Sequence, residues 1–286
     1  MFQVPEQFNA AAYFIDRHIG EGRAEKIAIE GFAGPDQAGE RITYRELFEN
    51  VNRCGNALRG LGLRREERIA LLLLDCREFF YSFFGAIKMG AVPVPLNTLL
   101  KPADYEYLLN DCRASIAIVS EALLPQLAAI SGRSLPYLHN VLVVRDHSSK
   151  RSDSDDRDFR SVIAAQPAEL APEPTNKDDA AFWLYSSGST GRPKGCVHLQ
   201  HDMAVAAEHY AVQVLGINER DRCFSVAKLF FAYGLGNAGY FPLTVGATSI
   251  LWPGSTHPAN VFACIERHKP TLFFSVPSNF AALLMH

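Results

Sequence analysis

The sequence predicts an α/β fold with mostly parallel sheets and flanking helices, arranged as two successive α/β subdomains. Continuous apolar runs such as RIALLLL alternate with amphipathic stretches of helical length, which is typical of right-handed βαβ units. A charged, Ser-rich and then Pro-rich run interrupts this alternation at residues 146–178. We therefore expect a first subdomain over residues 1–150, a polar linker or loop over 151–178 and a second subdomain over 179–286.

The first expected element is a helix over residues 42–62. Thr43 and Glu46 have the spacing of a capping box, and apolar residues recur at helical spacing after them. Gly60 and Gly62 end the pattern. The apolar and amphipathic runs that follow predict strands and helices in alternation, with strands at 68–74, 91–97, 116–120 and 140–144, and helices at 78–90, 103–112 and 121–130.

The alternation resumes after the polar run. It predicts strands at 180–187, 222–228, 247–253 and 271–277, and helices at 201–214, 233–246, 258–270 and 278–286. The last helical pattern reaches His286 without a cap, a glycine or a proline. We expect the sequence to be cut short there, with a native C-terminal helix as the alternative.

Composition excludes several classes of function. The 28 Lys and Arg residues balance 31 Asp and Glu residues, so no broad positive field attracts nucleic acid or an acidic membrane. The N-terminus has no signal-peptide pattern, and Asp75 and Lys88 interrupt the most apolar stretch. The six cysteines form no CxxC pair, which indicates reduced thiols in a cytoplasmic protein.

A small group of histidines has a spacing that could bind a metal ion. His198 and His201 lie three residues apart, with Glu208 and His209 further along. No cysteine or carboxylate set completes a site, so capping or surface roles are favoured. We assign no metal to them.

The run YSSGSTGRPKG combines small donors, glycines and one cation directly after an apolar strand. Its glycines permit positive φ and close backbone approach, its hydroxyl groups donate hydrogen bonds, and Lys194 supplies charge. The residues that we expect to contact the ligand are Ser186, Ser187, Gly188, Ser189, Thr190, Gly191, Lys194 and Gly195. A polyphosphate uses this set better than a carboxylate does, although a flexible Gly/Ser turn is the simpler alternative.

The spacing of this run excludes the P-loop NTPases. Counted from Gly188, their second glycine would fall at Pro193, and Gly195 replaces the hydroxyl residue that follows their lysine. Nor is there a GxSxG elbow, because Gly188, Ser189 and Thr190 follow Ser187. A different class of phosphate-binding loop remains.

YSSGSTGRPKG resembles the phosphate-binding signature of the adenylate-forming enzymes, which include acyl-CoA and aryl-CoA ligases, luciferases and peptide-synthetase adenylation domains. TYRELFENVNRCGNALRGLGL and GAIKMGAVPVPLNTLLKPADYEYLLND agree in order, so the resemblance covers nearly the whole chain. AKLFFAYGLGNAGYFPLTVGATSIL is most similar to the benzoate-CoA ligase branch. The resemblance implies that Phe231, Ala232, Tyr233 and Gly234 line the pocket for an aromatic carboxylate, whereas the residues alone favour ordinary core packing.

The resemblance also implies the reaction and its participants. An aromatic carboxylate would react with MgATP to give an acyl-adenylate and pyrophosphate, and coenzyme A would then displace AMP. Lys194 and Thr190 would be catalytic. Benzoate is the expected acid, with 4-hydroxybenzoate or 2-aminobenzoate as alternatives, and a homodimer is a possible assembly.

Motifs found further along in such enzymes are not in this sequence. They include a Tyr-Gly-x-Thr-Glu motif whose glutamate helps to hold Mg²⁺ and a lysine on a small C-terminal domain. We therefore expect the 286-residue chain alone to be inactive. The alternative from another class is a module that binds a nucleotide or an acid without activating it.

Overall fold

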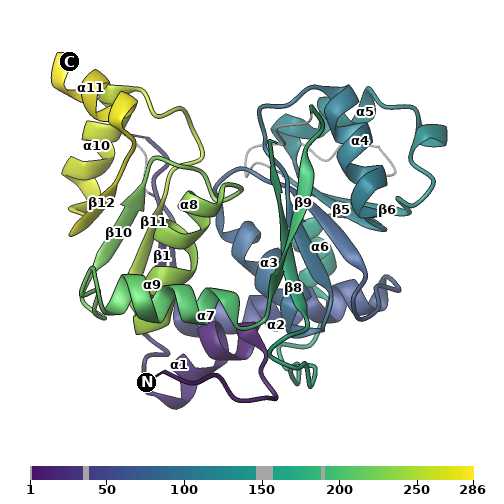
Figure 1. Ribbon diagram of the computed structural model, residues 1–286, viewed down its shortest axis with the longest axis horizontal. Coiled ribbons are helices and arrows are strands. Elements are labelled where there is room, and N and C mark those ends of the chain that lie inside the picture. The colour runs from purple at the N-terminus through teal and green to yellow at the C-terminus, as the bar shows by residue number, and fades with distance from the viewer. Residues whose placement is uncertain (1, 35–38, 146–156, 188–190) are drawn as a thin grey trace.

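The computed structural model describes residues 2–34, 39–145, 157–187 and 191–286. Two five-stranded sheets lie on either side of a central group of helices, and a two-stranded hairpin stands between them (Figure 1). All strand pairs of the larger sheets are parallel except the pair of β1 and β2. The predicted α/β class is confirmed.

The first sheet has the strand order β4-β3-β5-β6-β7. Its strands are β3 (Arg68–Leu72), β4 (Val92–Pro95), β5 (Ile116–Ser120), β6 (Asn140–Val144) and β7 (Arg157–Asp158). The second sheet has the order β12-β10-β11-β1-β2. Its strands are β1 (Ile27–Gly31), β2 (Arg41–Thr43), β10 (Arg222–Ser225), β11 (Thr248–Leu251) and β12 (Leu272–Phe274).

Helices cover both faces of each sheet. The longer helices are α2 (Tyr44–Gly60), α3 (Arg77–Lys88), α4 (Pro102–Cys112), α10 (Pro258–His268) and α11 (Pro277–Met285). The shorter helical segments are η1 (Ala12–Asp16), α1 (Arg17–Gly20), η2 (Glu121–Leu123), α5 (Leu124–Ala128), η3 (Gly132–Ser134), α6 (Phe159–Ala164), α7 (Asp202–Ala206), η4 (Ala207–Val212), α8 (Ala232–Gly234), η5 (Leu235–Tyr240) and α9 (Phe241–Val245).

Alternating side chains divide the apolar residues of β3 between two cores. Ile69 and Leu71 join the central core with α2 and α3, whereas Ala70 and Leu72 pack with α4 and α5 on the outer face. The second sheet behaves in the same way, since its outer face packs on α10 and its inner face joins the central core. One continuous core therefore lies between the two sheets.

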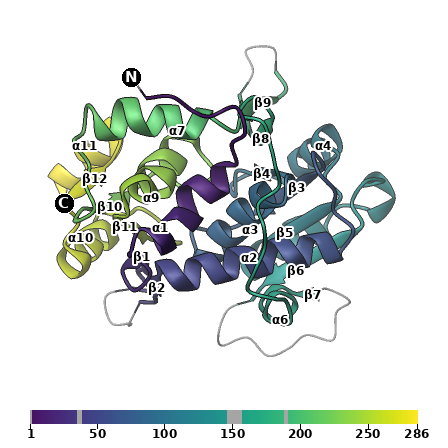
Figure 2. The same cartoon turned by 90° about the horizontal axis from the view of Figure 1, so that it is seen from below.

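Helix α2 begins with the predicted capping box. The Glu46 amide donates to Thr43 Oγ1 at 3.1 Å, and the Thr43 amide donates to the Glu46 carboxylate at 2.7 Å. Seen from below, α2 runs from the side of β1 and β2 toward β6 (Figure 2). This helix therefore contributes side chains to the central core between the two sheets.

The structure differs from the sequence expectation at two places. Strands β1 and β2 were not predicted, and β1 pairs in parallel with β11, so the second sheet takes strands from both ends of the chain. Part of the expected polar linker is also structured, because β7 and α6 lie within it and Phe159 and Ile163 are buried in the central core. A few apolar residues within a run rich in charged residues, Ser and Pro gave too weak a periodic signal.

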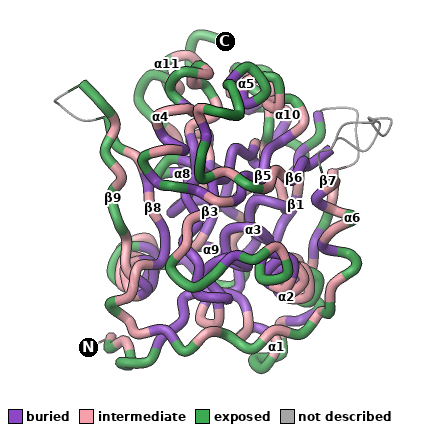
Figure 3. Tube along the Cα trace, turned by 90° about the vertical axis from the view of Figure 1, so that its right-hand side faces the viewer, coloured by how far each residue is buried: buried purple, intermediate pink, exposed green. Residues whose placement is uncertain are grey.

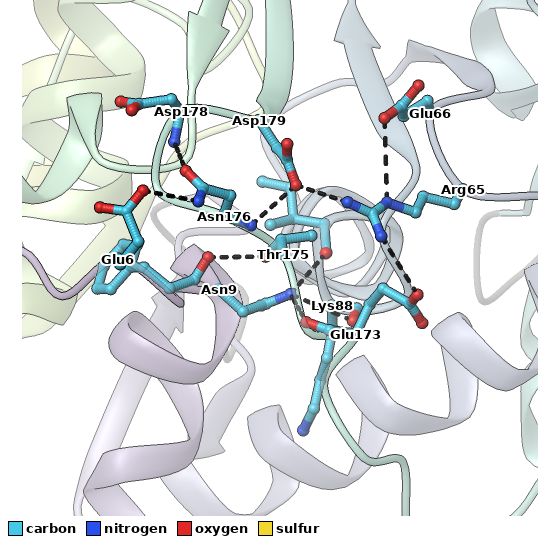
Figure 4. A network of polar contacts seen from close by, with 12 residues as sticks. Glu6, Asn9, Arg65, Glu66, Lys88, Glu173, Thr175, Asn176, Asp178 and Asp179 are labelled. Carbon is cyan, nitrogen blue, oxygen red and sulfur yellow. Dashed lines mark hydrogen bonds and ion pairs between the residues drawn. The ribbon is translucent and has the colours of Figure 1, made fainter.

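The segment after α6 is fixed by polar contacts to the N-terminal residues (Figure 4). Thr175 Oγ1 donates to Phe8 O at 2.7 Å, and the Asn9 amide donates to Ile87 O at 3.1 Å and to Glu173 O at 3.3 Å. The Gln200 amide in turn donates to Asp179 O at 2.9 Å. The segment therefore links α3, the N-terminal residues and the end of the hairpin.

Candidate functional site

The glycine-rich run forms the turn of an antiparallel hairpin of β8 (Ala180–Ser186) and β9 (Lys194–Leu199), with Ser186 opposite Lys194. The sequence had predicted β8 but not β9, and it had placed the run between a strand and a helix. That placement was wrong, because β9 intervenes before α7. Its mixed polar sequence KGCVHL lacks a clear period-2 pattern, and its edge is largely exposed (Figure 3).

The described residues of the predicted ligand set lie at the surface. Ser186, Ser187 and Lys194 are exposed, and within the described parts of the chain the Lys194 ammonium has no hydrogen-bond or ion-pair partner. Gly188, Ser189 and Thr190 lie outside the described residues. Where it is described, the run therefore presents hydroxyl groups and one uncompensated cation to solvent.

Two glycines of the run serve different purposes. Gly191 has φ of +101°, a conformation that L-residues with a side chain rarely adopt. Gly195 lies in β9, where a Cβ would meet the Trp183 ring at 3.1 Å. The expected positive φ therefore holds for Gly191, whereas Gly195 allows an indole ring to lie close against the backbone.

The aromatic motif lies at the start of α8. Phe231 and Tyr233 are 47% and 46% exposed, Ala232 is also exposed, and Gly234 is buried. A Cβ at Gly234 would lie 2.1 Å from Lys228 O, so only glycine fits there. The residues alone had favoured ordinary core packing of the aromatic side chains. That prediction is wrong for Phe231 and Tyr233, because nearly half of each side chain is exposed.

A cavity of about 1060 Å³ opens beside this motif. Its wall combines the motif with the ends of β3, β10 and β11 and with α11. The lining residues include Leu73, Leu74, Asp75, Lys228, Phe230, Phe231, Ala232, Tyr233, Gly254, Val276 and Asn279. A cavity of this size, with a largely apolar wall and few polar groups, has the features of a small-molecule site.

Asp75 and Lys228 form the charged part of this wall. Asp75 Oδ1 accepts a hydrogen bond from the Leu229 amide at 3.0 Å, and the two charged groups are 4.0 Å apart. Lys228 Nζ also donates to Gly254 O at 2.8 Å and to Trp252 O. Burial raises the pKa of Asp75 to about 6 and lowers the pKa of Lys228. The pair therefore ties the ends of β3, β10 and β11 together.

A second cavity of about 360 Å³ lies between the hairpin, helix α7 and the helical segment η5 that follows the motif. Ala232 lines both cavities, while Phe182, Leu184 and His198 line the smaller one from the hairpin side. Ala232 is thus the point at which the aromatic motif and the hairpin border a common space.

The histidines near this cavity have structural contacts. The His198 ring stacks on Phe182 with centroids 4.5 Å apart, and its Nδ1 lies 3.2 Å from Asp202 Oδ2. His201 Nδ1 lies 2.8 Å from Lys177 O. Among the described residues, no group of three or more His, Cys, Asp or Glu side chains could hold a metal ion.

Sequence reasoning missed Asp75 and Lys228. Both stand at the carboxyl ends of predicted strands, which is where open α/β sheets bind ligands, and this position was the available signal. Their pairing joins residues 153 positions apart, so no local pattern reveals it.

Of the helices that the structure describes, none has the length and apolar character to cross a membrane.

Comparison with known proteins gives the class to which this fold and site belong. The family model described as AMP-binding enzyme matches residues 16–286, so the chain belongs to that family. The benzoate–CoA ligase of Thauera aromatica is 44% identical over 283 residues, which are 99% of this chain and 51% of that protein. A 4-hydroxybenzoate–CoA/benzoate–CoA ligase of Rhodopseudomonas palustris is 42% identical over 277 residues, which are 97% of this chain and 49% of that protein.

Solved structures agree with this assignment. An anthranilate CoA ligase in complex with anthranoyl-AMP superposes with a TM-score of 0.90 at 40% identity, covering 98% of this chain and 52% of that one. A benzoate CoA ligase from Burkholderia xenovorans has a TM-score of 0.84 at 40% identity, with the same coverage. The chain therefore spans about half the length of the relatives it matches.

Proposed function

We propose that this chain is the N-terminal part of an ATP-dependent, AMP-forming aryl-CoA ligase, and that benzoate is its acid. The observation that carries the proposal is that the exposed aromatic motif borders a common space with the hairpin that bears the exposed Lys194, since Ala232 of the motif and Phe182 of the hairpin line the smaller cavity. The names of the relatives support the reaction class and an aromatic acid.

In the proposed first half-reaction, a carboxylate oxygen attacks the α-phosphorus of ATP. The bond from that phosphorus to the bridging oxygen breaks, and pyrophosphate leaves. Negative charge then grows on the leaving phosphates, where Lys194, Ser186 and Ser187 can stabilise it by charge and hydrogen bonds. Gly188, Ser189 and Thr190 are proposed as further donors.

In the second half-reaction, the thiol of coenzyme A attacks the acyl carbon, and AMP leaves. No pyrophosphate is present at this step, so the hairpin has little charge to stabilise. Mg²⁺ would accompany ATP as the counter-ion of its phosphates. The hairpin is therefore proposed to act mainly in adenylate formation.

The acid is proposed to bind with its ring against Phe231, Ala232 and Tyr233. Two exposed aromatic side chains beside a largely apolar cavity favour a flat ring over a flexible alkyl chain. Relatives named for benzoate, for 4-hydroxybenzoate and for anthranilate indicate which ring substituents to test.

Carboxylate-dependent ATP–pyrophosphate exchange by purified protein that carries this chain tests the proposal. Benzoate, 4-hydroxybenzoate, 2-aminobenzoate and a medium-chain fatty acid form the panel. We expect exchange to be fastest with benzoate and absent with the fatty acid. Equal stimulation by the fatty acid would contradict an aromatic pocket, and faster exchange with a substituted benzoate would reassign the acid.

A further inference from the structure

One face of helix α4 contacts the glycine-rich run on both sides of the hairpin turn. Tyr107 Oη donates to Pro193 O at 3.0 Å, directly before Lys194. Asp111 lies one helical turn later and accepts a hydrogen bond at 2.6 Å from Tyr185 Oη. Tyr185 is the residue directly before Ser186. Tyr107 and Asp111 share a helix face because they are four residues apart.

We propose that this face of α4 is a clamp that positions the glycine-rich run for a polyphosphate, with Tyr107 and Asp111 as positioning residues. The clamp comprises these two residues and their partners Pro193 and Tyr185. The inference rests on the proposed function, because that function assigns the run to pyrophosphate. Neither Tyr107 nor Asp111 stands in the run itself, so both act through the hairpin.

The contact of Tyr107 extends to Arg192. The Arg192 guanidinium lies 5.2 Å from the centroid of the Tyr107 ring, within the range of a cation–π interaction. One side chain of α4 therefore holds two consecutive residues of the run. These two residues lead directly into the exposed Lys194.

The hairpin needs external support of this kind. Strands β8 and β9 form their own two-stranded sheet, and isolated two-stranded hairpins are marginally stable in water. Trp183 and Tyr185 pack on the outer core that contains Leu108 and Leu109 of α4. Burial and the hydrogen bond to Asp111 both raise the pKa of Tyr185, so its hydroxyl keeps the proton that it donates.

The clamp holds the chain on either side of the turn, at Tyr185 and Pro193, before the ligand arrives, and so places the adjoining donors Ser186 and Lys194. A run that had to be ordered by the ligand would lose conformational entropy on binding, and affinity would fall accordingly. The clamp therefore predicts an effect on pyrophosphate affinity that exceeds any effect on overall stability.

The chain offers a matched control on the same helix. Tyr105 Oη donates to Asn97 O at 2.8 Å, so Tyr105→Phe also removes one hydroxyl-to-carbonyl hydrogen bond, but one whose acceptor lies in the loop after β4 and not in the hairpin. Tyr107→Phe keeps the ring beneath Arg192 and removes only the hydrogen bond to Pro193. Asp111→Asn retains an acceptor and removes the charge.

The first measurement is calorimetric titration of each purified protein with magnesium pyrophosphate, together with its thermal midpoint. We expect Tyr107→Phe to weaken pyrophosphate binding about 3–10-fold, because one hydrogen bond is lost. Asp111→Asn should cause a smaller loss of affinity. Tyr105→Phe should stay within about twofold of wild type. Equal affinity of Tyr107→Phe and wild type, or equal losses in both tyrosine variants, would overturn the clamp.

The second measurement is amide hydrogen exchange of Lys194–Leu199, detected by mass spectrometry without ligand. The clamp predicts faster exchange in Tyr107→Phe than in wild type or Tyr105→Phe. If wild type binds no pyrophosphate, the proposed function loses its phosphate site. Amide hydrogen exchange alone then tests the clamp. Equal hydrogen-exchange rates of Lys194–Leu199 in Tyr107→Phe and wild type would refute it.

Discussion

Asp75 carries a charge that its position in the cavity wall disfavours. Burial raises the pKa of this carboxyl from 3.8 to about 6, against the opposing effects of Lys228 and of the hydrogen bond from Leu229. The folded state thus binds more protons than the unfolded state between these two values. The free energy of unfolding should therefore fall as the pH rises from about 4 to about 6.

The variant Asp75→Asn tests this sign. It keeps an acceptor for the Leu229 amide and removes the charge, so it should gain stability relative to wild type as the pH rises. The expected gain at pH 7 is at most about 3 kcal/mol, which corresponds to about two pKa units. Urea unfolding of both proteins at several pH values measures it, and parallel curves for the two would contradict the assignment.

For single residues, the sequence predicts the chemical character of a site better than it predicts which side chains are in contact. The glycine, hydroxyl and lysine pattern of the run is local and was readable directly. The bond from Tyr107 to Pro193 and the pair of Asp75 with Lys228 depend on how distant elements pack, so no spacing reveals them. The different roles of Gly191 and Gly195 also emerge only from the hairpin geometry.

Helices α2 and α3 cross where two glycines face each other. A Cβ at Gly85 would lie 2.9 Å from Val51 O and 3.0 Å from the Gly55 amide nitrogen. Backbone atoms cannot move aside as flexible side chains can. The close crossing places both helices against the central core.

Gly85→Ala should therefore destabilise the protein, although alanine favours helix by about 1 kcal/mol over glycine. We expect a net loss of about 1–3 kcal/mol in urea unfolding, typical of overpacking. Gly60→Ala is the matched control in α2, because its added Cβ meets no atom of another element within 4 Å. A stabilised Gly85→Ala protein would show that the helices separate easily.

At the element scale, most segments could be predicted because their apolar periodicity is strong. The helix predicted for 201–214 appears as α7 followed by η4, and that predicted for 233–246 as α8, η5 and α9. Two of the failures share one cause. β9 and the 157–164 region mix apolar and polar residues without a clear period, so tertiary contacts rather than periodicity decide their structure. The missed strand β1 depends instead on its pairing with β11, far along the chain.

The central core joins the two sheets into one unit. It receives Ile69 and Leu71 from the first sheet, Cys223 and Leu251 from the second, and the buried faces of α2 and α3. We propose that the regions predicted as two subdomains unfold together. Strand β1 strengthens this coupling because it pairs with β11 of the second sheet.

The two tryptophans test this cooperativity. Trp183 lies on β8 and packs with the outer core of the first sheet, whereas Trp252 packs with the outer core of the second. In Trp183→Phe and in Trp252→Phe, fluorescence of the remaining indole and circular dichroism should give the same urea midpoint. An earlier fluorescence transition in either variant would indicate independent unfolding of that region.

We propose that the hairpin stabilises departing pyrophosphate. Lys194→Met should lower carboxylate-dependent ATP–pyrophosphate exchange by about 100-fold or more, because a positioned cation is lost where charge develops. Thioester formation from preformed benzoyl-adenylate should change by only about threefold or less. Lys101→Met removes another exposed lysine and should leave both rates at wild-type levels.

Comparison of these two half-reactions in protein that carries this chain is the most direct test. Selective loss of exchange in Lys194→Met is the result we predict. Equal losses in both half-reactions, or exchange at the wild-type rate, would contradict the role assigned to the hairpin.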